Sequence, residues 1–387
     1  MKKINSITYS ILDDLKKLNE YIYHNPELGN EEFKSSKAHI DILKKHGFQV
    51  EEEYLGIKTA FKAYYKSKKE GPTICYLSEY DALPEIGHGC GHNLLGTTNT
   101  GAAIVLKHLL DEIGGNVVVF GTPAEETNGA KVTMVDKGAF NDVDIAMLAH
   151  PASTYSKSGT SLALEPIQFT FKGKASHAAS DPEKGINALD AVIMTFNSIN
   201  ALREHILPSA RIHGVITEGG KAANIVPDLA IAQFYVRTTT KAYMKELIEK
   251  VKNCAKGAAL ATGTSLEMSN YEFSYDDLVT NESLSEIFSQ NLKAQGIENP
   301  DKTKVSFGSV DMGNVSHVCP AIHPYFGIYG DDSIAAHTRE FRDATLTDKA
   351  YENMIITINA LVKTGIQVIQ DKDLFEKIME EFKASQK

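Results

Sequence analysis

Residues that commonly bind metal ions occur in a few short stretches of the chain. Cys90 and His92 stand two residues apart around a glycine, Glu125 and Glu126 are adjacent, and His150 follows. A thiolate, an imidazole and a carboxylate together suit a borderline-soft divalent ion such as Zn²⁺ or Mn²⁺. A Cys-x-His pair alone is more often a buried cysteine beside a polar histidine, and a Glu-Glu pair is more often solvated. Their joint occurrence favours a metal site.

The adjacent glutamates suggest a division of labour. Neighbouring side chains in an extended or turn segment diverge, so we expect Glu125 and Glu126 to differ in role. One carboxylate would ligate the metal, while the other would hold the attacking water and move its proton, as metal-assisted hydrolysis requires. A cysteine hydrolase with Cys90 as nucleophile is an alternative hypothesis for an enzyme.

Predicted strands place these residues together. Apolar runs typical of buried parallel strands occur at Thr73–Ser78, Val117–Gly121 and Asp144–Ala149, and a helix-like stretch at 101–110 separates the first two. Polar residues follow each run. Because ligands bind beyond the carboxyl ends of parallel strands, the three stretches should meet at one edge of a sheet.

The rest of the chain predicts two domains. Apolar residues at helical spacing predict helices at 7–23 and 31–45. After about residue 275 the sequence again shows the pattern of predicted helices and strands that is typical of an α/β domain. Between these parts the pattern predicts four strands and two helices, an α+β arrangement. We therefore expect a doubly wound, mixed-sheet α/β catalytic domain (1–165 and 275–387) interrupted by an inserted α+β domain (166–274).

Composition excludes several classes of function. The 40 Lys and Arg residues against 50 Asp and Glu residues give a net charge of −10, with no basic cluster for nucleic acid. No segment approaches the roughly 18 apolar residues of a membrane span, and no signal-peptide core is present, so we expect a cytoplasmic protein without a membrane partner. The 4 cysteines show no disulfide pattern.

Several motifs resemble those of a known family. The segments concerned are Glu79-Tyr80-Asp81-Ala82-Leu83-Pro84, Gly87-His88-Gly89-Cys90-Gly91-His92-Asn93, Gly121-Thr122-Pro123-Ala124-Glu125-Glu126 and His150-Pro151. They resemble the dinuclear metallopeptidases that include aminoacylases and carboxypeptidase G, within the amidohydrolase branch that carries Cys-Gly-His. The resemblance is greatest to p-aminobenzoyl-glutamate hydrolases and β-alanyl-lysine-type dipeptidases, and it extends from His24-Asn25-Pro26-Glu27-Leu28 to His337.

The resemblance implies a set of roles at the metal site. Two divalent ions, zinc or manganese with cobalt as a further candidate, would be held by Cys90, His92, Glu126, His150 and His337. Glu125 would be the general base and acid, and Asp81 would orient a ligand. Many relatives carry a histidine two residues before that aspartate, where this chain has Glu79, so the sharing of ligands between the two ions stays open.

The inserted domain carries further family features. The resemblance implies a lid and dimerisation domain in which His177 stabilises an oxyanion, while Asn224 and Arg237 contact the substrate. The alternatives are that His177 is a polar surface histidine and that Arg237 is an ordinary surface arginine. Asp311, Asn314 and His323 are candidates for shaping the substrate pocket.

We thus expect a homodimeric or higher-oligomeric metal-dependent hydrolase of a dipeptide or an N-acyl amino acid, such as a p-aminobenzoyl one. The alternative from another class is a catalytically silent binding or accessory subunit on the same fold.

Overall fold

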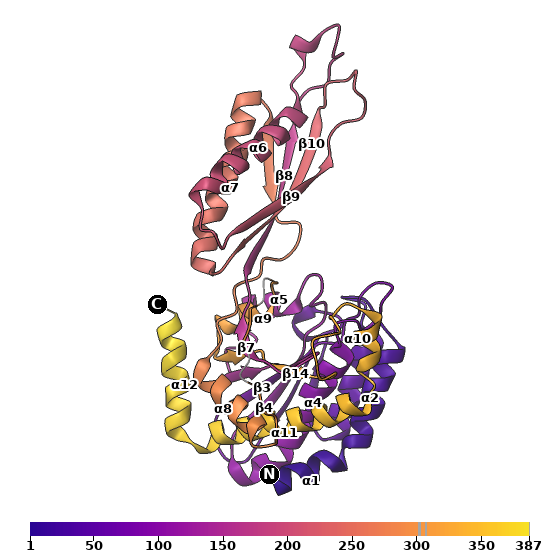
Figure 1. Cartoon of the computed structure of the whole chain (residues 1–387), viewed down its shortest axis with the longest axis vertical. Helices are drawn as coiled ribbons and strands as arrows, with labels where there is room; N and C mark the ends of the chain where they lie inside the picture. Colours follow the sequence, from indigo (N-terminus) through magenta and orange to yellow (C-terminus); the bar gives the residue numbers. More distant parts are fainter. Residues whose placement is uncertain (301–302, 306–307, 387) are drawn as a thin grey trace. The chain divides into compact units, whose positions relative to one another are not determined.

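The chain forms two units in the computed structural model, which describes residues 1–300, 303–305 and 308–386 (Figure 1). Unit 1 comprises Met1–Thr160, Leu278–Ser306 and Asp311–Lys387, and unit 2 comprises Ser161–Asp277 and Phe307–Val310. Unit 2 is therefore inserted into the sequence of unit 1.

A mixed six-stranded sheet forms the centre of unit 1. In spatial order its strands are β1 (Gln49–Glu52), β2 (Phe61–Lys66), β4 (Asn116–Gly121), β3 (Thr73–Ser78), β5 (Ile145–Met147) and β13 (Ala321–Ile322). The pairs β1/β2 and β2/β4 are antiparallel, whereas β4, β3, β5 and β13 are mutually parallel. The last four strands therefore end at the same edge, and the loops that follow them start there.

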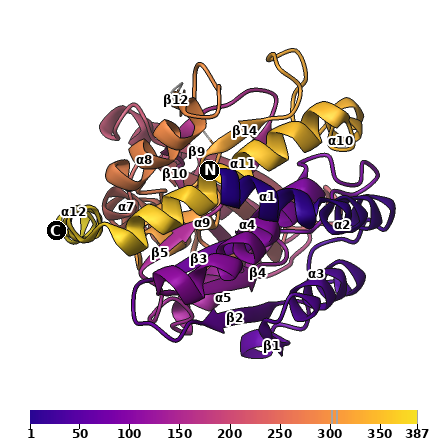
Figure 2. The ribbon, with the colours of Figure 1, turned by 90° about the horizontal axis from the view of Figure 1, so that it is seen from below.

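The helices of unit 1 pack against its sheet and against one another. They are α1 (Lys2–Ser10), α2 (Leu12–His24), α3 (Phe33–Lys45), α4 (His92–Ile113), α8 (Glu282–Lys293), α11 (Asp348–Gln370) and α12 (Lys372–Ser385). Helix α4 packs against β3 and β4 and lies beside α11 (Figure 2). The hydroxyl of Tyr76 on β3 donates to the carbonyl of Leu361 on α11 at 3.2 Å. Apolar burial across this layer provides most of the stability of unit 1.

Short elements complete unit 1 around the carboxyl edge of the sheet. They are α5 (Ala130–Asp136), α9 (Met312–Ser316), α10 (Arg339–Ala344), β6 (His150–Ala152), β7 (Lys157–Thr160), β12 (Thr303–Val305), β14 (Tyr325–Gly327) and a 3₁₀ turn at Tyr54–Gly56. Strand β14 pairs in parallel with β6, which places Tyr325 opposite His150.

Unit 2 is an antiparallel sheet with two helices. Its strands, in spatial order, are β11 (Ser265–Ser269), β8 (Ala163–Lys172), β10 (Leu229–Thr238) and β9 (Arg211–Glu218). Helices α6 (Ala188–Leu202) and α7 (Lys241–Thr262) contact each other and the two central strands. Residues of β10 alternate between buried and partly exposed, as expected for a sheet with one covered face. Short 3₁₀ turns lie at Pro182–Lys184 and Arg203–His205.

The predicted mixed α/β class is confirmed, and several element boundaries are corrected. The helix predicted at 7–23 is two helices, α1 and α2, with a break at Ile11. The helix predicted at 101–110 begins much earlier, at His92, because burial against the sheet overrides the low helix propensity of its glycines and threonines. The third strand, predicted at Asp144–Ala149, is Ile145–Met147, and His150 begins the separate strand β6.

Within the described part of the chain, no helix is both long and apolar enough to cross a membrane.

Candidate active site

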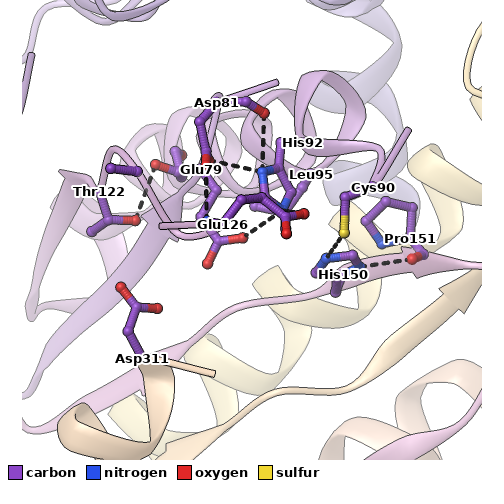
Figure 3. A network of polar contacts seen from close by, with 12 residues as sticks. Glu79, Asp81, Cys90, His92, Leu95, Thr122, Glu126, His150, Pro151 and Asp311 are labelled. Atoms are coloured by element: carbon purple, nitrogen blue, oxygen red, sulfur yellow. Dashed lines mark hydrogen bonds and ion pairs between the residues drawn. The ribbon is translucent and has the colours of Figure 1, made fainter. Parts of the chain in front are cut away.

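Loops from neighbouring parallel strands carry the candidate site. Glu79 and Asp81 follow β3, Glu125 and Glu126 follow β4, and His150 follows β5. Because these strands are parallel, all three loops start at one edge of the sheet. Figure 3 shows Asp81, His92 and Glu126 together, with Cys90 and His150 pointing toward each other beside them.

A glycine places Cys90 and His92 on either side of a sharp turn. Gly91 has a φ of +82° and immediately precedes α4, so His92 is the first helical residue. A β-carbon at Gly91 would lie 2.7 Å from Cγ of Pro151, so the turn requires glycine in both conformation and space. The Sγ atom of Cys90 then lies 3.6 Å from Nε2 of His150.

Asp81 orients both His92 and the following glutamate loop. Oδ1 of Asp81 lies 2.8 Å from Nδ1 of His92, and Oδ2 accepts the backbone N–H of Glu126 at 3.0 Å. Because Nδ1 of His92 is engaged, Nε2 is the ring nitrogen that faces the other candidate ligands. A carboxylate that orients a histidine in this way is typical of metal sites.

Glu126 connects the glutamate loop to the C-terminal part of the chain. Its Oε1 lies 3.4 Å from Nε2 of His337 and 4.0 Å from Nε2 of His92. His337 has a φ of +66°, and its backbone N–H donates to the carbonyl of Gly89 at 2.8 Å. Such a left-handed conformation in a non-glycine residue is characteristic of functional sites.

The expectation that Glu125 and Glu126 diverge is wrong for their carboxylates. One oxygen of each and one nitrogen of His92 all lie within 4.8 Å of one another. The preceding residue, Ala124, has a φ of +63°, and the pair lies in a turn in which adjacent side chains need not alternate as they do in a strand. Both carboxylates therefore face the same group of ligands.

The donor atoms form overlapping groups suited to divalent ions. Within each group the donor atoms lie within 4.8 Å of one another, and the groups are Cys90/His92/His150, Cys90/Glu126/His337 and His92/Glu125/Glu126. Nε2 of His92 and Oε1 of Glu126 are buried and have no hydrogen-bond partner among the described residues. Because buried polar atoms are normally satisfied, these atoms fit bonds to a metal ion. The mixed sulfur, nitrogen and oxygen donors suit Zn²⁺, Mn²⁺ or Co²⁺.

The electrostatics of the cluster favour an added positive charge. Burial alone would lower the pKa of His92, but Asp81 and Cys90 raise it well above its ordinary value. Burial raises the pKa of the Cys90 thiol, so this sulfur needs a nearby cation to become a thiolate. A divalent ion bound at these atoms would supply the positive charge that the surroundings of His92 favour, and it would stabilise the thiolate form of Cys90.

Glu125 has the properties of a proton carrier. Burial raises its pKa well above the ordinary value, and the carboxylates of Glu79, Glu126 and Asp311 raise it further. A carboxyl group whose pKa is raised holds a proton more readily than an ordinary one, which suits a group that accepts and returns a proton during a reaction.

A buried ion-pair network beside these ligands was not predicted. Nζ of Lys131 lies 2.7 Å from Oε1 of Glu79 and 2.7 Å from Oδ1 of Asp311. The other oxygen of Glu79 lies 3.3 Å from Nε2 of His92. A lysine in a short helix carries no sequence signal of burial, so the sequence offered no means of finding Lys131.

The three residues considered for the substrate pocket are all buried in unit 1. Asp311 pairs with Lys131 and is fully buried, so its direct contacts are with the ion-pair network. Asn314 is buried on α9. The ring of His323 lies 5.6 Å from that of His150, and burial lowers the pKa of His323 to about 4. His323 therefore lies beside a candidate ligand, His150.

Three further candidate residues lie in unit 2. Nδ1 of His177 accepts the backbone N–H groups of Ala179 and Ser180 at 3.2 and 3.1 Å, so the ring proton is on Nε2. The carbonyl of Asn224 accepts the N–H of Ala178 at 3.0 Å, so Asn224 lies beside the residue that follows His177. Nη1 of Arg237, on β10, donates to Oγ of Ser309 at 2.9 Å.

Comparison with known proteins identifies relatives of the whole chain. The peptidase dimerisation domain matches residues 167–262, within unit 2. The chain is 34% identical over 386 residues to the Xaa-Arg dipeptidase of Mus musculus, covering 95% of this chain and 88% of the relative. It is 38% identical over 269 residues to one component of the p-aminobenzoyl-glutamate hydrolase of Escherichia coli, covering 64% of this chain and 56% of the relative.

The fold also matches solved structures. A dinuclear metal binding peptidase of Bacillus subtilis from the M20 family superposes with a TM-score of 0.64 at 20% identity, covering 91% of this chain and 98% of that chain. The similarity to the mouse dipeptidase over 95% of this chain and the matched dimerisation domain show that the chain belongs to the M20 metallopeptidase family.

Proposed function

We propose that the protein is a metal-dependent amidohydrolase that cleaves the amide bond of a dipeptide or an N-acyl amino acid. The family assignment makes the chain a hydrolase of peptide and related amide bonds. The observation that carries the proposal is the meeting of sulfur, imidazole and carboxylate donors around His92, with Glu125 and its raised pKa among them.

The proposal gives each residue a distinct task. Cys90, His92, Glu126, His150 and His337 would hold two divalent ions. When bound, such ions lower the pKa of water and polarise the substrate carbonyl. Glu125 accepts the proton of the attacking water on its carboxylate and returns it to the nitrogen of the leaving amine. Asp81 keeps His92 and the Glu126 backbone in place through its two oxygens.

Residues of unit 2 would recognise the substrate. His177 has its ring proton on Nε2, which suits donation to an oxyanion, and we assign it that task. We assign recognition of the substrate's carboxylate to Asn224 and Arg237, because a guanidinium group binds a carboxylate with two parallel hydrogen bonds. The matched dimerisation domain supports a homodimer formed through unit 2.

The chemistry of the site disfavours both alternatives. Burial raises the pKa of Cys90, whereas a nucleophilic cysteine needs a lowered one. A catalytically silent subunit would have no use for a base, yet a carboxylate oxygen of Glu125 lies within 4.8 Å of donor atoms of His92 and Glu126.

A substrate screen on metal-reconstituted protein tests the proposal. Wild-type protein loaded with Zn²⁺, Mn²⁺ or Co²⁺ is assayed on dipeptides with basic C-terminal residues and on p-aminobenzoyl and other N-acyl amino acids. Glu125→Gln should retain the bound metal and lose about 10²–10⁴-fold in kcat, because only the proton carrier is changed. Wild-type kcat in Glu125→Gln, or full activity in a chelator with loss on alkylation of Cys90, contradicts the mechanism.

A further inference from the structure

The segment between α2 and α3 contacts both loops that carry the candidate ligands. The carbonyl of Glu27 accepts the N–H of Ala82, beside Asp81, at 2.8 Å. Gly29 lies directly against the other loop, since a β-carbon there would come within 3.0 Å of Cα of Ala124. The mechanism proposed above gives this segment no task, although its sequence is part of the family resemblance.

Ala124 has a backbone conformation that needs support from its surroundings. Its φ of +63° is in the left-handed region, which L-residues other than glycine seldom adopt. It is fully buried and immediately precedes Glu125 and Glu126. Strained conformations of this kind persist only where neighbouring groups hold them.

Glu32 supplies the contact that holds this turn. Its Oε1 accepts the backbone N–H of Ala124 at 2.8 Å, and its Oε2 accepts the hydroxyl of Thr59 at 2.9 Å. The Glu32 side chain is buried, and Thr59 is fixed in turn because its carbonyl accepts the hydroxyl of Tyr80 at 2.6 Å. The carboxylate therefore has a fixed position.

We propose that Glu32 is a positioning residue for the site: by accepting the Ala124 N–H, it holds the left-handed turn that directs the carboxylates of Glu125 and Glu126 toward His92. This inference rests on the proposed function for the roles of those two carboxylates. Glu32 itself belongs to none of the groups of candidate ligands, so it acts through Ala124.

The hydrogen bond does not require a charged Glu32. Burial, and then the neighbouring Asp81, raises the pKa of Glu32 to about 7. An oxygen of the carboxyl group can accept the Ala124 N–H whether or not the other oxygen carries a proton. The amide oxygen of glutamine can do the same, so Glu32→Gln should preserve the contact that Glu32→Ala removes.

The test measures metal affinity apart from activity. Metal-free protein is titrated with ZnCl₂ in a calorimeter, and kcat and KM are measured separately on the loaded enzyme. Glu32→Ala should bind Zn²⁺ about 10–100-fold more weakly and lose kcat by a similar factor with little change in KM, as for other residues that orient metal ligands. For Glu32→Gln, the Zn²⁺ affinity and kcat should each remain within about threefold of the wild-type values.

A second substitution and a matched control separate positioning from stability. Glycine adopts the left-handed conformation without strain. The double variant Glu32→Ala/Ala124→Gly should therefore bind Zn²⁺ at least about tenfold more tightly than Glu32→Ala alone. The control is Glu27→Ala: the Glu27 carboxylate accepts the N–H groups of Lys34 and Ser35 at the start of α3, whereas the Ala124 N–H is donated to Glu32. It should lower the Tm and leave the Zn²⁺ affinity within about threefold of wild type.

The outcomes distinguish this inference from the proposed function. Wild-type affinity in Glu32→Ala, equal losses in Glu32→Gln and Glu32→Ala, or no recovery in the double variant overturns the positioning role. If no substrate is hydrolysed and the affinities still follow the expected order, the proposed function fails and the positioning role stands. A wild-type protein that binds none of Zn²⁺, Mn²⁺ or Co²⁺ overturns both.

Discussion

Replacing Lys131 with methionine tests whether unit 1 depends on a buried cation. The ammonium group lies 2.7 Å from each of its partners, Glu79 and Asp311, and the three side chains are 0%, 2% and 0% exposed. Methionine has a similar length and packs well in apolar surroundings, but it carries no charge. The variant Lys131→Met therefore leaves two carboxylates buried without their cation.

The expected destabilisation is large for a single substitution. Removing one partner of a buried ion pair costs about 3–5 kcal/mol, because the remaining charge is neither solvated nor paired. For a unit of this size, each kcal/mol lowers Tm by about 2–4 °C, so the expected decrease is about 6–20 °C. The triple variant Lys131→Met/Glu79→Gln/Asp311→Asn removes all three charges and should recover most of the loss.

Differential scanning calorimetry of metal-free protein at pH 7 measures both effects. Lys250→Met is the matched control, because Lys250 pairs with Glu246 on the exposed surface of α7, where such a pair contributes little. A Tm for Lys131→Met within about 2 °C of wild type would refute the reasoning, since it would mean that the two carboxylates are stable without the lysine.

Other expected outcomes concern pH, capping and ligand orientation. Burial lowers the pKa of His39 to about 3. Below about pH 6.5 the unfolded state therefore binds a proton at His39 that the folded state does not bind. Urea titrations should show the free energy of unfolding decreasing by up to about 1.4 kcal/mol per pH unit as the pH falls from 6 to 4. The decrease should be less steep in His39→Leu. The side chain of Asn187 caps α6 through the N–H of Leu189 at 2.9 Å, and Asn187→Ala should cost about 1 kcal/mol in the same assay. Asp81→Asn should weaken Zn²⁺ binding about 10–100-fold by calorimetry, because it alters the contacts to both His92 and the Glu126 backbone; unchanged affinity would contradict this.

The sequence is informative where a pattern has one physical explanation. The apolar run Thr73–Ser78 matches β3 at both ends, since a short, wholly buried parallel strand leaves little choice of boundary. Cys90, His92 and His150 are indicated by their types and their places after predicted strands, and the structure brings their donor atoms within 4.8 Å of one another. His337 is placed only by resemblance, because nothing local in its sequence indicates where a distant loop returns.

Other features depend on tertiary contacts that no local pattern records. The left-handed backbone of Ala124 brings the two glutamate carboxylates to one side, whereas the prediction for an extended or turn segment is divergence. The burial of Lys131 follows from the carboxylates around it, which come from distant parts of the sequence. The early start of α4 reflects packing against the sheet, which outweighs the poor helix propensity of its first three turns.

The insertion of unit 2 has a consequence for biosynthesis. The chain leaves unit 1 at Thr160 and re-enters it at Leu278, so a ribosome completes all of unit 2 before it makes Asp311 or His337. Chains fold progressively from the N-terminus during translation, yet a nascent chain arrested before these residues lacks one candidate ligand, His337, and one of the two partners of Lys131, Asp311. Tight retention of metal should therefore arise only after His337 has been synthesised.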